Sequence, residues 1–219
     1  MVDSAPVTIP IGRLHVVTDT RDGRDPVAVA EAALAAGAPV LQVRVDDRYS
    51  DREAYDLAVH LAAKCAEHGA VCLINDRLHV ALAVGAHGGH VGAADLPVHA
   101  ARTVLGANAI VGGTCRDPES ARALRRAGAS YLGVGPTFST STKTGLPDPL
   151  GPRRVGEIAA AVDIPVVAVG GVTADAVPGL LAAGVHGVAV VSAVSDAPDP
   201  YKATRELLDA IASAGVAPQ

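Results

Sequence analysis

Short runs of β-branched and other apolar residues alternate with alanine-rich stretches along almost the whole of this 219-residue chain. Each run is continuously apolar rather than alternating in polarity, which is typical of parallel strands covered on both faces. Strands are expected at residues 14–18, 40–45, 70–74, 89–91, 109–112, 131–134, 165–169 and 187–191. Helices are expected near residues 27–36, 51–68, 77–84, 97–105, 117–127, 152–161, 173–183 and 201–213.

Eight strand–helix units in a chain of this length predict an α/β protein, a single (β/α)8 TIM barrel. A doubly wound open sheet is the alternative, but it usually carries GxGxxG after its first strand, where this chain has Thr18-Asp19-Thr20. Glycines recur where several helices should end, in AAGA, EHGA, VGAH, RAGA and AAGV, and fit the left-handed position after a helix. We expect one domain over residues 1–219, with 1–10 and 215–219 frayed.

Composition narrows the classes of partner and the compartment. The net charge of −5 argues against nucleic-acid binding, and no apolar run reaches the length of a membrane span. The N-terminus lacks the pattern of a secretory signal, and three cysteines without CxxC spacing favour reduced thiols. The chain is therefore expected to be cytoplasmic. Its eight histidines are scattered, so most are interpreted as surface or packing residues.

The segment after the sixth expected strand carries six hydroxyl side chains and one lysine, in GPTFSTSTKTG at residues 135–145. Hydroxyls, backbone N–H groups and a lysine together suit a phosphate or pyrophosphate. The alternative is a solvated surface loop. Strand ends meet at one face of a barrel, so the polar residues that follow the other strands should face this segment.

Two further strand ends indicate a phosphate site. Gly170-Gly171 precede the seventh expected helix and leave backbone N–H groups accessible to an anion, and Val191-Ser192 follow the eighth strand. The loops after strands seven and eight are the frequent phosphate site of this fold.

Two carboxylates follow neighbouring strands. Asp76 comes after the third strand and Asp95 after the fourth, so both should project into one mouth. Mg²⁺ binds few carboxylates together with water and phosphate oxygens, which predicts that this pair is a magnesium site. The alternative is that Asp76 and Asp95 are helix N-caps or loop residues.

The motifs together resemble the thiamine-phosphate synthase (thiamine-phosphate pyrophosphorylase) family over nearly the whole chain. They are QxR at 42–44, ND at 75–76, GxxD at 92–95, GPTFSTSTK at 135–143, GGVT at 170–173 and VSA at 191–193. The resemblance implies a transferase of thiamine biosynthesis. Such an enzyme joins 4-amino-5-hydroxymethyl-2-methylpyrimidine diphosphate to 4-methyl-5-(2-phosphoethyl)thiazole and releases pyrophosphate through a carbocation.

The resemblance also implies a role for each motif residue. Arg44, Asn75, Thr114 and Lys143 would hold the pyrophosphate, and Arg44, Thr114 and Lys143 would be the catalytic residues. Asp76 and Asp95 would bind Mg²⁺. The substrate contacts would be Gln42 on the pyrimidine, Thr140 and Thr142 on the thiazole, and Gly171, Val191 and Ser192 on the thiazole phosphate.

Three positions depart from the family pattern. Asp46 stands where the family usually has the lysine of QxRxK, GQxD is GAAD at 92–95, and Thr114 replaces a serine. Asp46 removes a pyrophosphate contact, so either it turns away and Arg48 or Arg116 substitutes, or the enzyme is slow. A thiazole tautomerase-like barrel and a weakly active or inactive phosphate-binding paralogue remain alternatives. The partners are small molecules, with no nucleic acid or membrane, and a homo-oligomer is left open.

Overall fold

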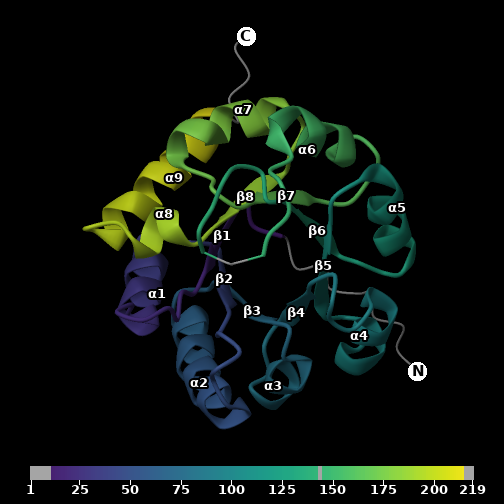
Figure 1. The fold of residues 1–219 in the computed structure, drawn as a ribbon. Coiled ribbons are helices and arrows are strands. Elements are labelled where there is room, and N and C mark those ends of the chain that lie inside the picture. The colour runs from purple at the N-terminus through teal and green to yellow at the C-terminus, as the bar shows by residue number, and fades with distance from the viewer. Residues whose placement is uncertain (1–10, 143–144, 215–219) are drawn as a thin grey trace.

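Eight parallel strands pair in chain order and close into a barrel in the computed structural model, which describes residues 11–142 and 145–214 (Figure 1). The strands are β1 (Leu14–Val17), β2 (Val40–Val43), β3 (Val71–Asn75), β4 (Gly88–Val91), β5 (Ile110–Cys115), β6 (Tyr131–Val134), β7 (Val166–Val169) and β8 (Gly187–Val190). Pairing of β1 with β8, from Leu14 opposite Val188 to Val16 opposite Val190, closes the ring. The predicted (β/α)8 barrel is confirmed.

Helices follow the strands and surround them as an outer layer (Figure 1). They are α1 (Pro26–Ala35), α2 (Asp51–Glu67), α3 (Leu78–Ala83), α4 (Val98–Leu105), α5 (Pro118–Arg126), α6 (Gly151–Ala159), the 3₁₀ turn η1 (Ala174–Ala176), α7 (Val177–Ala182), α8 (Ser192–Ser195) and α9 (Pro200–Ala214). No helix in the described ranges is long and apolar enough to cross a membrane. The single domain over 1–219 stays a prediction, and its expected frayed ends lie outside the described residues.

Local sequence signals start and end the helices. Ser50 and Glu53 form a reciprocal capping box at the start of α2, and the Asp117 carboxylate accepts the Ser120 N–H at the start of α5. The five glycines of the repeated pattern, at 37, 69, 85, 128 and 184, all have positive φ. They adopt the left-handed conformation expected where a helix turns into the next strand.

Two strand boundaries differ from the prediction by more than one residue. β2 ends at Val43 rather than at residue 45, because the backbone N–H and carbonyl of Arg44 are hydrogen-bonded to the Thr18 hydroxyl. That hydroxyl donates to the Arg44 carbonyl at 2.6 Å and accepts the Arg44 N–H at 2.8 Å. β5 continues past residue 112 to Cys115. The prediction ended too early because glycine has low strand propensity, yet Gly112 and Gly113 still pair with β6.

The expected helix at 173–183 is divided. A 3₁₀ turn covers Ala174–Ala176, and α7 begins only at Val177, with Pro178 in its first turn. Proline fits the first turn of an α-helix but not its interior, which places the α-helical start here. Thr173 precedes this turn and makes no side-chain capping bond. The four-residue α8 was not predicted, because so short a helix leaves no periodic pattern.

Side chains fill the barrel interior. An inner apolar layer comprises Val17, Val40, Leu73, Ile110, Tyr131, Val167 and Ala189. Two histidines join it: His15 on β1 is fully buried and His90 on β4 is almost so. The His15 and Tyr131 ring centroids lie 5.2 Å apart, and those of His90 and Tyr131 lie 5.5 Å apart. The interior is therefore a packed core with three polar rings in contact at its centre, in edge-on and tilted arrangements.

The buried carboxylate of Asp19 ties the loop after β1 to α8. Arg21 donates to both of its oxygens, with Nη2 at 2.6 Å from Oδ2, and the Ser195 hydroxyl donates to Oδ2 at 2.7 Å. Arg21 also reaches Asp196 at 3.1 Å. Burial alone would raise the pKa of Asp19, but the hydrogen bonds from Arg21 and Ser195 lower it to about 2 from 3.8. This network fixes the β1–β8 seam at the strand ends.

Asp19→Asn should lower the free energy of unfolding by about 3 kcal/mol at pH 7, because Arg21 loses its charged partner inside the seam. The folded-state pKa of Asp19 lies below its unfolded value, so its contribution is complete above about pH 4. It is lost as the pH falls through 3.8 towards 2, and the difference between variant and wild type should shrink over that range. Urea unfolding at several pH values measures both effects.

The matched control is Asp209→Asn, which removes an exposed carboxylate paired with Arg205 at 3.1 Å on α9. An exposed pair of this kind contributes about 0.5 kcal/mol. An Asp19→Asn loss no larger than that of the control would contradict the role of Asp19 in the seam.

Candidate functional site

A cavity of about 420 Å³ lies at the carboxyl ends of the strands, and every strand or the loop after it contributes to its lining. Of the twelve residues predicted for the site, eleven line this cavity: Gln42, Arg44, Asn75, Asp76, Asp95, Thr114, Thr140, Thr142, Gly171, Val191 and Ser192. The twelfth, Lys143, lies outside the described residues. Strand ends brought together by barrel closure thus form one chamber that holds the predicted polar residues.

The amide side chains of β2 and β3 meet at one wall of the cavity. Gln42 Nε2 donates to Asn75 Oδ1 at 2.7 Å, which fixes the orientation of both amides. The oxygen of Gln42 and the nitrogen of Asn75 can then act towards a ligand as an acceptor and a donor. Arg44 follows Gln42 by two residues and lines the same cavity, as the alternation of side chains along a strand requires.

A buried hydrogen-bonded chain connects the barrel interior to the cavity. His90 Nε2 lies 2.8 Å from Thr114 Oγ1, and His90 Nδ1 lies 3.0 Å from the Tyr131 hydroxyl. Burial lowers the pKa of His90 to about 4, so at neutral pH its ring is uncharged and offers one donor and one acceptor. His90 therefore holds the Thr114 hydroxyl in one orientation from below.

Both candidate metal-binding carboxylates line the cavity next to each other in the barrel. Asp76 directly follows β3, its φ is +60°, and its N–H donates to the His90 carbonyl on β4 at 2.9 Å. Asp95 Oδ2 accepts the Gly92 N–H at 2.8 Å, so this carboxylate closes the loop after β4. The loop role weighed for Asp95 is therefore present, and the N-cap of α4 is Pro97. Although one of its oxygens accepts this backbone N–H, the Asp95 carboxylate also lines the cavity.

The hydroxyl-rich loop after β6 divides as expected. Thr140 and Thr142 line the cavity with their hydroxyls 3.1 Å apart, whereas Ser139 and Ser141 are exposed. The base of this loop packs on the turn after β7, where Phe138 N–H donates to the Gly170 carbonyl at 2.9 Å.

Gly170 and Gly171 are required by this packing. A Cβ on Gly170 would lie 2.7 Å from the Pro136 side chain, and one on Gly171 would lie 2.9 Å from that of Phe138. Both glycines also have positive φ. The sequence pattern suggested that they admit an anion; in the structure they also admit the neighbouring loop, which brings Thr140 and Thr142 over the cavity.

Three cavity residues were missed by the sequence analysis. His15, His90 and Tyr131 line the floor, although the histidines were interpreted as scattered surface or packing residues. The available signal was positional and covers two of the three: His90 on β4 and Tyr131 on β6 both lie opposite Gly112 of β5. A Cβ on Gly112 would overlap the Tyr131 ring and His90 Nδ1, and one on Gly133 would lie 2.9 Å from His90 Cε1.

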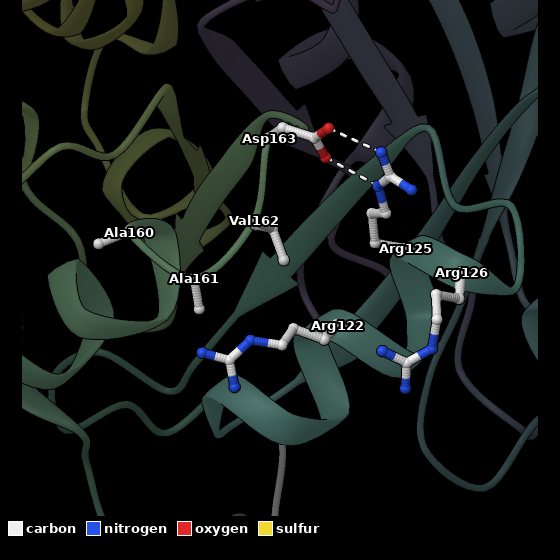
Figure 2. Close-up of a pocket in the computed structure, with 7 residues that line it drawn as sticks. All are labelled: Arg122, Arg125, Arg126, Ala160, Ala161, Val162 and Asp163. Carbon is white, nitrogen blue, oxygen red and sulfur yellow. Dashed lines mark hydrogen bonds and ion pairs between the residues drawn. The ribbon is translucent and has the colours of Figure 1, made fainter.

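A second cavity, of about 500 Å³, lies outside the barrel between α5 and the end of α6 (Figure 2). Arg122, Arg125 and Arg126 line it, and Arg125 forms a bidentate pair with Asp163 at 2.8 and 2.7 Å. Arg125 and Arg126 stand in the last turn of α5, where positive charge offsets the helix dipole. The cavity contains none of the predicted site residues, and we assign it no chemistry.

A family model for thiamine monophosphate synthase matches residues 14–194. The chain belongs to the thiamine monophosphate synthase family. Proteins named thiamine-phosphate synthase from Salinispora arenicola and Salinispora tropica are 56% and 57% identical over 203 residues, which is 92% of this chain and 98% of each relative. The solved structure of thiamine phosphate pyrophosphorylase from Pyrococcus furiosus superposes with a TM-score of 0.85 at 35% identity, covering 92% of this chain and 96% of that one.

In this family member Asp46, the acidic residue that departs from the family pattern, lies outside the cavity. Asp46 is absent from the cavity lining; its Oδ1 lies 3.9 Å from Arg44 Nη2 and its Oδ2 lies 3.5 Å from Arg48 Nη2. Arg48 also stays outside the lining and binds Asp22 Oδ1 and the Thr20 carbonyl, each at 2.5 Å. Of the two arginines weighed as substitutes for the family's lysine, only Arg116 lines the cavity.

Gly112→Ala should destabilise this family member by about 3 kcal/mol or displace His90 and Tyr131, because the added methyl overlaps their side chains. Thermal unfolding and the environment of Tyr131 in near-ultraviolet circular dichroism measure the change.

Gly179→Ala in α7 is the matched control, since nothing lies within 4 Å of its added Cβ. This control should stabilise the helix by about 0.5–1 kcal/mol. A Gly112→Ala protein as stable as the control would refute the steric account of the barrel interior.

Proposed function

We propose that this chain couples 4-amino-5-hydroxymethyl-2-methylpyrimidine diphosphate to 4-methyl-5-(2-phosphoethyl)thiazole and releases pyrophosphate, as a thiamine-phosphate synthase. Membership of the family and two relatives of that name at 56% and 57% identity support the enzyme class, a transferase of thiamine biosynthesis. The observation that carries the proposal is the gathering of eleven predicted site residues around one cavity.

The proposed reaction is a dissociative substitution at the pyrimidinylmethyl carbon. The bond from that carbon to the diphosphate oxygen breaks first, and the electron pair leaves with pyrophosphate. The thiazole nitrogen then supplies the electron pair of the new carbon–nitrogen bond. The hard step is the departure of the leaving group, so the site needs fixed positive charge and hydrogen-bond donors rather than a nucleophile.

Each cavity residue has a part in this proposal. Arg44, Asn75 and Thr114, together with Lys143, would bind the pyrophosphate and stabilise its charge as it leaves. Gln42, held by Asn75, would orient the pyrimidine. The thiazole contacts would come from Thr140 and Thr142, and its phosphate would meet Gly171, Val191 and Ser192.

Asp76 and Asp95 suit Mg²⁺ by the chemistry of their donor atoms. Among the described residues, no group of three or more histidine, cysteine or acidic side chains is placed to hold a metal ion. A pair of carboxylates matches the preference of Mg²⁺ for one or two protein oxygens completed by water and substrate phosphates. When bound, the ion would supply positive charge to the departing pyrophosphate. We also place the reaction in the cytoplasm, which agrees with three buried, unpaired cysteines.

The test is to mix the protein with both substrates and Mg²⁺ and to measure pyrophosphate and thiamine phosphate together. Equal amounts of the two products support the proposal. Absence of both at high protein concentration would refute it and leave the inactive phosphate-binding paralogue. Proton exchange on the thiazole without pyrophosphate release would indicate the tautomerase-like alternative instead.

Asp76→Asn should lower kcat/KM about 100-fold and raise the Mg²⁺ concentration needed for half-maximal rate, because an amide binds the ion more weakly than a carboxylate. The control is Asp163→Asn, which removes the carboxylate paired with Arg125 outside the barrel. A magnesium dependence identical in Asp76→Asn and wild type would rule out Asp76 as a ligand.

A further inference from the structure

Arg116 is a cavity residue whose guanidinium is only half satisfied. Its Nη2 donates to the Asp148 carbonyl at 2.6 Å, in the segment that leads from the hydroxyl-rich loop into α6. Its Nη1 is buried from solvent and has no hydrogen-bond partner among residues 11–142 and 145–214. A buried, permanently charged donor without an acceptor costs free energy, so its retention in a cavity calls for an explanation, and a bound anion would supply one.

The position of Arg116 on the chain directs it to the same ligand as Thr114. Residues two apart on a strand point to the same side, and Gly112, Thr114 and Arg116 form such a series at the end of β5. Gly112 makes room for the buried rings, Thr114 is held by His90, and both Thr114 and Arg116 line the cavity above.

The charge balance of the cavity indicates that the positive charge of Arg116 is needed for an anionic ligand. Its described lining holds two arginines, Arg44 and Arg116, against two carboxylates, Asp76 and Asp95. Asp46, 3.9 Å from Arg44 Nη2, offsets part of the Arg44 charge. A diphosphate bearing several negative charges therefore meets less positive potential from β2 than a lysine at position 46 would provide.

We propose that Arg116 is a second guanidinium ligand for the diphosphate, replacing from β5 the charge that Asp46 removes from β2. This inference rests on the proposed function for the identity of the anion. The Nη1 group donates to a diphosphate oxygen, while the Nη2 bond to Asp148 keeps the side chain extended across the mouth. A guanidinium suits this double task because its donors are arranged in a planar fork.

The first experiment measures binding of inorganic pyrophosphate by calorimetry in the presence of Mg²⁺. Arg116→Gln should raise its Kd about 10- to 100-fold, the effect of losing one charge-assisted contact. The KM for the thiazole phosphate should stay within about threefold, because that substrate meets other loops. Arg48→Gln is the matched control, because Arg48 also contacts Asp46 but lies outside the cavity. The pyrophosphate Kd of this variant should stay within about twofold of the wild-type value.

A charge rescue separates ligand binding from loop support. Asp46→Lys in the Arg116→Gln background should recover about tenfold of the lost pyrophosphate affinity, since it restores a cation to β2. A purely structural Arg116 would not be rescued, and its loss would weaken both substrates equally through the displaced Thr140 and Thr142. Either of those results, or an unchanged pyrophosphate Kd in Arg116→Gln, overturns the inference.

Folding and activity are checked separately. If Arg116→Gln fails to fold, Arg116→Lys keeps the charge without the fork and should raise the Kd about three- to tenfold; an unchanged Kd overturns the inference. A wild-type protein that binds pyrophosphate through Arg116 but releases none from the substrates would refute the proposed function and support this assignment. A wild-type protein that turns over but binds pyrophosphate equally well after Arg116→Gln would refute only the assignment.

Discussion

Space inside the barrel is the constraint on which the rest of the structure depends. Three polar rings, His15, His90 and Tyr131, occupy the interior below the cavity. His90 and Tyr131 fit because Gly112 on β5 and Gly133 on β6 carry no side chain. Burial keeps both histidines neutral, with pKa values of about 3 for His15 and about 4 for His90. The core can therefore hold polar groups without burying charge, and it presents a hydrogen-bonded Thr114 to the chamber above.

Above this floor, the charged side chains come from the ends of several strands rather than from one sequence motif. Asp46 pairs with Arg44 and Arg48 and stays out of the cavity, so the acidic departure becomes part of an ion-pair network at the rim. Arg116 approaches from the opposite part of the barrel and is tied to the loop that carries Thr140 and Thr142. One side chain thus contacts both the cavity and the segment that follows this loop.

The sequence predicted the barrel because its evidence is local and repeated. Apolar runs recur eight-fold, glycines follow five of the helices, and strand-end residues must converge once the barrel closes. The failures have physical causes. Gly112 and Gly113 concealed the end of β5, the Thr18 hydroxyl ended β2 early, and Pro178 divided a predicted helix. His15 and His90 were missed because their importance depends on which strand each faces across the interior, which periodicity does not reveal.

A crystal structure with thiamine phosphate, pyrophosphate and Mg²⁺ bound tests the central claim most directly, that the chamber above the rings holds both halves of the reaction. The account predicts pyrophosphate within hydrogen-bond distance of Arg44, Thr114 and Arg116, with the metal ion between it and Asp76 and Asp95. It predicts the thiazole phosphate beside Gly171 and Ser192. Pyrophosphate found instead between α5 and α6, or an empty chamber at saturating ligand concentrations, would contradict it.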